Sequence, residues 1–259
     1  MVSLRPTSRL SSSSLLAFLL VIAIASYLQA LTGFALGLFA LGGVIALNIS
    51  SIATASMVIN VLMVVNVTLA LRGYWSEIHK RLFWLTLAGL IPGAFLGIFL
   101  LQHLEDRYAD LLQMILGILI LVAGATMAML AQVRPVISSA PGFVLTGILG
   151  GVCGGMYSIP GPPVVYLFYR QPLPLDTVRS TLLAVFGTLS VVRLVLLTMQ
   201  GEVTADVLEL SMFAVPVVIV VTALAPYMPL RVPDQAVRRI AFVLLGLLGL
   251  AIVGSAGLR

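Results

Sequence analysis

A few polar residues lie inside long apolar runs, and their types decide what chemistry these runs can perform. Arg193 lies seven positions before Gln200, where a polar connector begins, so about 10 Å of helix separates it from that end. Such an arginine could contact an anion, lock helices together, or snorkel to the membrane interface. Asn60 lies near the middle of its run, with Ser56 one helical turn earlier on the same face. Asn60 could bind a substrate or join helices by hydrogen bonds.

The stretch from Gly147 to Tyr169 holds six glycines and three prolines between two apolar runs. Glycine strips the backbone of side-chain cover and proline removes an N–H donor, so a continuous helix through 159–164 is not expected. In hydrocarbon, interrupted backbone survives only where protein buries it or where it lines a wet cavity. A helix that restarts after the interruption would offer free N–H groups and a positive dipole end to an anion.

We therefore predict an anion site built from two glycine-rich segments and the polar positions near them. Its residues are Gly33, Gly37, Gly42, Gly43, Asn60, Gly154, Gly155, Ser158, Gly161, Pro162, Pro163 and Arg193. Glycines four residues apart also let helices pack closely in lipid, which would explain Gly33 with Gly37, and Gly151 with Gly155, without any ligand. We expect Gln29 and Asn48, which flank the first segment, to satisfy its interrupted backbone.

The residues of an enzyme site are missing from the apolar runs. Both histidines, His79 and His103, lie in connectors, and no apolar run holds two carboxylates. The sequence has neither H-E-x-x-H nor G-x-S-x-G. The single cysteine, Cys153, has no base near it in sequence, so a small buried residue is favoured over a nucleophile. We expect no enzyme activity, cofactor or metal.

Composition places these residues in a membrane protein. Hydrophobic residues make up 61% of the chain and charged residues 9%, whereas soluble domains hold about 25% charged residues. The mean hydropathy is +1.17. The net charge of +5 is scattered singly or in pairs, without the basic stripe of a nucleic-acid-binding protein.

Apolar runs follow one another along the chain, most of them near the length of about 20 residues that crosses a bilayer as a helix. They lie at 15–31, 33–47, 52–71, 82–101, 111–132, 142–169, 178–199, 207–227 and 237–257. The start resembles a secretory signal, but Leu28 fits the minus-three position before Ala30 poorly, so we expect it to be retained. We predict a polar N-terminal segment over 1–14 and a single transmembrane domain over 15–257.

The two halves of the chain repeat the same order of features. The matched residues are Gly33 and Gly151, Gly73 and Gly201, and Pro92 and Pro216. We predict an all-α integral membrane fold of about eight hydrophobic helical elements in two inverted repeats, at about 15–132 and 141–257. Each repeat opens with a broken glycine-rich hairpin, and paired broken segments mark the substrate site in many transporters.

The basic residues predict how often each glycine-rich segment crosses the membrane. A single crossing would divide them seven against six between the two sides. An even number of crossings places nine on one side, at Arg72, Lys80, Arg81, Arg134, Arg170, Arg179, Arg231, Arg238 and Arg239. Four then share the other side, at Arg5, Arg9, Arg107 and Arg259. Because cytoplasmic loops carry the excess of basic residues, we expect hairpins, with both chain ends outside.

These motifs resemble the TauE/SafE family of membrane permeases, the sulfite exporter group, from about residue 30 onward. The family's second glycine-rich segment has the pattern G-x-x-x-G-x-x-G-x-x-G-P-P. This chain follows it at Gly151, Gly155, Ser158, Gly161, Pro162 and Pro163, with Ser158 in place of a glycine. The stretch 179–186, Arg193 with Leu194, and 91–93 with Gly97 also look like family features. The first glycine-rich copy departs from the pattern at Phe39, Ala40 and Val44.

The resemblance implies export of sulfite, sulfonates or related organosulfur anions. We therefore predict a secondary transporter of a small anion, with its site between the two hairpins, in the bacterial cytoplasmic (inner) membrane. The alternative is a membrane-embedded enzyme or assembly factor without transport activity. The expected partners are the anion and the lipid bilayer, without nucleic acid; a proton or sodium as the coupling ion, and a homodimer, are left open.

Overall fold

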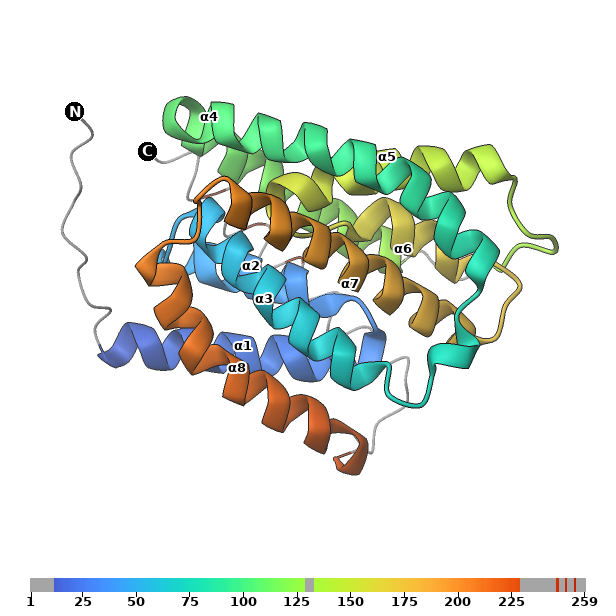
Figure 1. Ribbon diagram of the computed structural model, residues 1–259, viewed down its shortest axis with the longest axis horizontal. Coiled ribbons are helices and arrows are strands. Elements are labelled where there is room, and N and C mark those ends of the chain that lie inside the picture. Colours follow the sequence, from blue (N-terminus) through green and yellow to red (C-terminus); the bar gives the residue numbers. More distant parts are fainter. Residues whose placement is uncertain (1–11, 129–132, 229–245, 247–249, 251–253, 255–259) are drawn as a thin grey trace.

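Every described element of the chain is a helix (Figure 1). The computed structural model describes residues 12–128 and 133–228, together with positions 246, 250 and 254. The α-helices are α1 (Ser12–Thr32), α2 (Ala35–Ala46), α3 (Ile52–Ala70), α4 (Lys80–Ala128), α5 (Ala140–Tyr157), α6 (Gly161–Tyr169), α7 (Leu175–Met199) and α8 (Ala205–Leu224). Two short 3-10 helices are η1 (Trp75–Glu77) and η2 (Ala225–Tyr227). The all-α prediction is confirmed for this part, while most of the run predicted at 237–257 lies outside the described residues.

Six helices in the described ranges are long and apolar enough to cross a membrane. These spans are Ser12–Ala30, Ile52–Ala70, Lys80–Leu104, Ala140–Tyr157, Leu175–Met199 and Ala205–Leu224. Helices suit these sequences because each backbone N–H and C=O is satisfied within the helix, as hydrocarbon requires. Polar caps mark two of the starts: the Ser51 hydroxyl accepts from the Thr54 N–H at 3.2 Å, and Thr204 from the Val207 N–H at 3.4 Å.

The helix α4 consists of two helical stretches that meet at Tyr108. The runs at 82–101 and 111–132 were predicted to be separated by a polar connector over 102–110, and within it Tyr108 has non-helical backbone (φ −136°, ψ 39°). The apolar helical stretches on either side are Lys80–Leu104 and Asp110–Val122. The break therefore lies in the predicted connector, although helix extends further into the connector than the apolar runs indicate.

The interruption in the second glycine-rich segment is shorter, and lies earlier, than the sequence predicts. It covers only the three residues from Ser158 to Pro160, and α6 begins at Gly161. Pro162 and Pro163 fall in the first turn of α6. The first N–H groups of a helix have no partner within the helix, so prolines are tolerated there and do not prolong the interruption.

Hydrogen bonds between residues in the connectors and near the helix ends define the two ends of the bundle. At one end the His79 N–H donates to the Thr181 hydroxyl at 3.0 Å, and the Arg134 N–H donates to the Arg170 carbonyl at 2.8 Å. At the other end the Gln102 amide donates to Gln200 at 2.7 Å. We call the first the basic end, since its segments contain Arg72, Lys80, Arg81, Arg134, Arg170 and Arg179 against Glu77 and Asp176. The second is the acidic end, whose segments contain Glu105, Asp106, Asp110, Glu202, Asp206 and Glu209 against Arg107.

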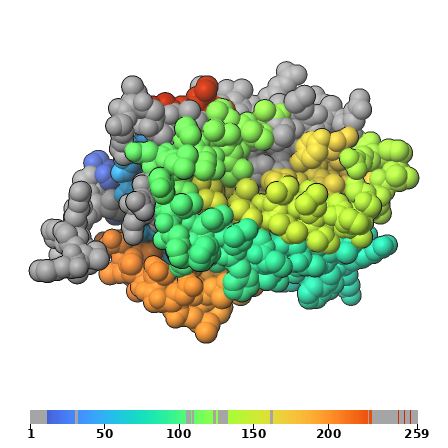
Figure 2. Space-filling model, turned by 90° about the horizontal axis from the view of Figure 1, so that it is seen from above, coloured from blue at the N-terminus to red at the C-terminus, as the bar shows by residue number. Residues whose placement is uncertain are grey.

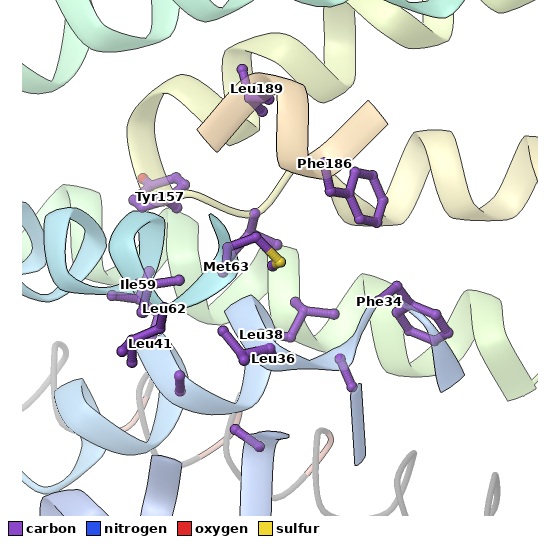
Figure 3. Packing of buried hydrophobic residues seen from close by; sticks show 14 of the residues in the cluster. Phe34, Leu36, Leu38, Leu41, Ile59, Leu62, Met63, Tyr157, Phe186 and Leu189 are labelled. Carbon is purple, nitrogen blue, oxygen red and sulfur yellow. The ribbon is translucent and has the colours of Figure 1, made fainter. Parts of the chain in front are cut away.

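The helices α3 and α7 pack against each other and run in opposite directions (Figure 1). Two hydrogen bonds show the antiparallel arrangement. Arg193, near the end of α7, donates to Ser56, near the start of α3. At the other end Thr181, near the start of α7, accepts from His79, which follows α3 in the chain. Figure 3 shows the apolar core around them. It includes Leu36, Leu38 and Leu41 of α2, Ile59, Leu62 and Met63 of α3, and Phe186 and Leu189 of α7.

Candidate functional site

Two interruptions in the helices meet inside the bundle. The first, at Gly33 and Phe34, separates α1 from α2, and the second separates α5 from α6. Gly33 (φ +82°) and Ser158 (φ 57°) have left-handed backbone, which costs a serine more than a glycine. A Cβ atom at Gly37, in the first turn of α2, would lie 2.9 Å from the Ser158 carbonyl oxygen. The absence of a side chain at Gly37 therefore allows the first turn of α2, which follows the first interruption, to touch the second interruption.

The first interruption is satisfied by Gln29, as the sequence predicts. Its side-chain oxygen accepts from the Leu36 N–H at 2.9 Å, which caps the start of α2. Its amide nitrogen lies 3.5 Å from the Gly33 carbonyl oxygen and 3.6 Å from the sulfur of Met63. Gln29 thereby fixes the direction in which α2 leaves the interruption.

A polar cluster surrounds the second interruption; it consists of Ser56, Asn60, Ser158 and Arg193. The Arg193 guanidinium donates through Nη1 to the Ser158 hydroxyl and through Nη2 to the Ser56 hydroxyl, the latter at 3.0 Å. The single Ser158 proton can go to the Ser56 carbonyl at 2.7 Å or to Asn60 Oδ1 at 3.0 Å. The cluster therefore joins α3, α7 and the interruption after α5.

The polar cluster is closed to solvent. Arg193 and Asn60 are each 1% exposed, which excludes an arginine that snorkels to the interface. Asn60 Nδ2 is buried and has no hydrogen-bond partner among the residues that the structure describes. A buried donor without a partner costs about 1–3 kcal/mol. An anion beside Arg193 would accept from this amide and balance the guanidinium charge.

Of the predicted site residues, the structure brings four together: Gly37, Asn60, Ser158 and Arg193. Gly33 lies at the first interruption, where its nearest neighbour is the stem of Arg179. Gly42 is buried in α2, and Gly43 packs against Val21 of α1. Residues 161–163 form the first turn of α6, next to the cluster along the chain.

The glycines of α5 divide between two faces of that helix. A Cβ atom at Gly154 would lie 2.4 Å from the Leu189 side chain and 3.2 Å from Pro160 Cβ, so Gly154 faces the interruption. At Gly155 the same atom would lie 2.3 Å from the Ala94 carbonyl oxygen of α4. The structure therefore places Gly155, which was predicted to line the anion site, against α4.

The comparison with protein-family models matches residues 18–252 to the family described as sulfite exporter TauE/SafE. The chain belongs to this family. Over 223 residues, this TauE/SafE chain is 33% identical to the probable sulfite/organosulfonate exporter TauE of Cupriavidus necator, covering 86% of this chain and 87% of that relative. No solved structure matches the chain. Together with the six apolar helices of the described part, membership of this family shows that the chain is a multi-pass membrane transport protein.

The polar cluster of this TauE/SafE protein suits an oxyanion. A guanidinium presents several N–H donors in one plane, and hydroxyl and amide groups add donors from other directions. Within residues 12–128 and 133–228, no group of three His, Cys, Asp or Glu side chains could hold a metal ion. The N–H donors of the polar cluster are of the kind that can donate to a negatively charged partner.

The sequence offers close helix packing as an alternative role for Gly151 and Gly155, and the structure shows that the partner helix is α4. Three glycines of α4 pack against three of α5, and we call this contact the glycine seam: Gly89, Gly93 and Gly97 with Gly147, Gly151 and Gly155. A Cβ atom at any of the six would lie 2.0–2.3 Å from a carbonyl oxygen of the facing helix. Figure 2 shows α5 lying along α4 on this side of the molecule. The signal is present in the sequence as two rows of glycines with a four-residue period.

Proposed function

We propose that this TauE/SafE protein exports a small organosulfur anion, such as sulfite or an organosulfonate, across the bacterial cytoplasmic membrane. The observation behind this proposal is the buried polar cluster, where Arg193 and the unpartnered amide of Asn60 meet at two helix interruptions. The printed name of the Cupriavidus relative supports the class of anion.

The packing of the helices supports two inverted repeats, at about 15–132 and 141–257, within one transmembrane domain over 15–257. Matching pairs of helices pack in both halves: α1–α2 and α5–α6, α2–α3 and α6–α7, α3–α8 and α7–α4, α1–α8 and α5–α4. Gly73 after α3 and Gly201 after α7 both have positive φ, at +85° and +77°. Since α3 and α7 are antiparallel, a two-fold axis in the membrane plane would exchange the halves.

Transport through a closed site needs two conformations that open it to opposite sides. With Arg193 at 1% exposure, an anion cannot reach the cluster without movement of the surrounding helices. We propose that one repeat moves against the other, as in other transporters with inverted repeats. A proton or sodium gradient drives the export in this scheme, and a homodimer is compatible with it.

The first prediction concerns Arg193 and uses purified protein in proteoliposomes. Wild-type protein should release preloaded sulfite or methanesulfonate faster than liposomes without protein. Arg193→Gln should lower this rate at least about tenfold, because a hydrogen bond to a charged group contributes about 1.5–3 kcal/mol. Arg193→Lys should retain part of the rate, because it keeps the charge but loses the planar donor pair.

Thermal stability and anion affinity, measured on the same preparations, separate binding from folding. If both variants transport like wild type at equal incorporation, Arg193 is not part of the site. If wild type moves neither sulfite nor any organosulfonate tested, the proposed function itself is wrong.

A further inference from the structure

A second arginine of α7, Arg179, lies beside the first helix interruption. A Cβ atom at Gly33 would lie 3.4 Å from Arg179 Cγ and 3.6 Å from Arg179 Cβ, so the aliphatic part of the Arg179 side chain packs against this glycine. Arg179 is half-buried. Its Nε is shielded from solvent and has no hydrogen-bond partner within the described part of the chain. The stem of Arg179 thus packs on the interruption, and its Nε is a donor that an oxyanion could satisfy.

Arg179 and Arg193 lie on the same face of α7. Fourteen residues separate them (193 − 179), which corresponds to about 21 Å along the helix and to directions about 40° apart. Arg179 belongs to the basic end, whereas Arg193 belongs to the closed polar cluster. The helix face that carries both arginines therefore runs from the basic end to the polar cluster.

Phe186 lies midway along this face, seven residues from each arginine. It is 2% exposed, and Figure 3 shows it in the apolar core together with Met63 and Phe34. These side chains offer no hydrogen bond to a passing anion, and a desolvated charge without partners is costly. The path between the two arginines is therefore blocked in this closed state.

We infer that Arg179 forms an outer anion site, which holds sulfite or the sulfonate group of an organosulfonate before it reaches the polar cluster, with Phe186 as the barrier between. This inference rests on the proposed function. The basic residues of the same end raise the local concentration of anions. Arg179, held against Gly33, then gives the anion a defined place near the break at which α1 and α2 can separate.

The test compares Arg179→Gln with Arg81→Gln in proteoliposomes. Arg81 is exposed at the same end, so its variant removes the same charge without touching Gly33. Arg179→Gln should raise the KM for sulfite added on the basic-end side about five- to tenfold, while the KM from the acidic-end side changes less than about twofold. Arg81→Gln should stay within about twofold on both sides, because exposed charges are screened by salt. Arg179→Lys should recover most of the loss, since it retains the charge.

Equilibrium binding of sulfite to detergent-purified protein gives an independent measurement. Arg179→Gln should leave the affinity within about twofold of wild type, because Arg193 and Asn60 are unchanged. The inference is overturned if Arg179→Gln and Arg81→Gln have the same effect. It is also overturned if Arg179→Gln raises the KM equally from both sides with a lower melting temperature, which is the result of a packing role. Active wild type with an unaffected Arg179→Gln refutes the outer site alone, whereas inactive wild type refutes the proposed function.

Discussion

At the centre of the molecule, hydroxyl groups from two parts of the chain hold one guanidinium group. Ser56 comes from α3, and Ser158 comes from the interruption after α5. Ser158 can fill this role because its left-handed backbone turns its side chain away from the course of α5. At this position the family pattern has a glycine. The serine therefore combines a conformation typical of glycine with a hydroxyl that contacts Arg193.

The sequence predicts that Arg193 and Asn60 belong to an anion site, because a charge or an amide inside an apolar run needs a partner. Their exact partners could not be predicted. Helical periodicity places Ser56 and Asn60 on one face of α3, but says nothing about which distant segment faces them. That Ser158 meets them depends on where α5 ends, and the sequence predicts an interruption over 159–164, whereas the structure has it at 158–160.

The second prediction concerns Asn60 and uses Asn66 as its matched control. Both are buried asparagines of α3, but Asn66 donates to Thr222 of α8 at 2.8 Å, away from the polar cluster. Asn60→Leu should weaken sulfite binding about ten- to a hundredfold, since it removes a donor to an anion worth about 1.5–3 kcal/mol. Asn66→Leu should lower the melting temperature and leave the affinity of the folded protein unchanged.

Calorimetric binding and thermal unfolding of the two variants would check this prediction. Equal affinities in Asn60→Leu and wild type would show that Asn60 only joins helices, which is the alternative that its sequence position leaves open.

At the scale of whole elements, glycine serves two separate purposes in α5. One face closes the seam against α4, and the other lets α5 approach Pro160 and α7. The positions of most spans could be predicted from the lengths of the apolar runs, because a helix that crosses a bilayer needs about 20 apolar residues. The division of the glycines could not be predicted, since both faces have the same residue type and spacing. Only the facing helix decides whether a glycine supports packing or an interruption.

The third prediction therefore concerns Gly155 and the seam. Gly155→Ala places a carbon 2.3 Å from the Ala94 carbonyl oxygen, so the helices must move apart. We expect a loss of stability of about 1–3 kcal/mol, with the sulfite affinity of the folded fraction unchanged. Gly142→Ala is the matched control in the same helix, because its new carbon would lie 3.7 Å from the Ser139 hydroxyl. This control should retain or gain stability, up to about 1 kcal/mol from helix propensity.

Thermal unfolding and sulfite titration of both variants show whether Gly155 packs against α4 or contacts the ligand. A stable Gly155→Ala protein with weakened affinity would place Gly155 at the ligand, as the sequence alone predicts, and would contradict its assignment to the seam.

At the scale of the whole molecule, charge is distributed unequally between the two ends of the bundle. The basic end has six basic residues in its described segments against two acids, and the acidic end has one against six. Exposed aromatic residues accompany the basic end, with Trp75 61% and Trp84 66% exposed. Tryptophan side chains favour the boundary between lipid and water, and cytoplasmic loops favour Lys and Arg. The basic end therefore fits the cytoplasmic surface, where an exported anion is received.

The last prediction tests this orientation together with the even number of crossings. Single cysteines are introduced after Cys153→Ala, at Ser76 and Asp176 of the basic end and at Glu202 of the acidic end, all exposed positions. The connectors after α3 and before α7 meet at one end, where the His79 N–H donates to Thr181, and the proposed hairpins predict that both face the same side of the membrane. In intact cells, a membrane-impermeant maleimide should label Glu202→Cys and leave Ser76→Cys and Asp176→Cys unlabelled until the cells are opened. Labelling of Ser76→Cys and Asp176→Cys from opposite sides would refute the inverted repeats. Labelling of both from outside, with Glu202→Cys protected, would keep the repeats but reverse the orientation, and the outer site at Arg179 would then face the wrong side for export.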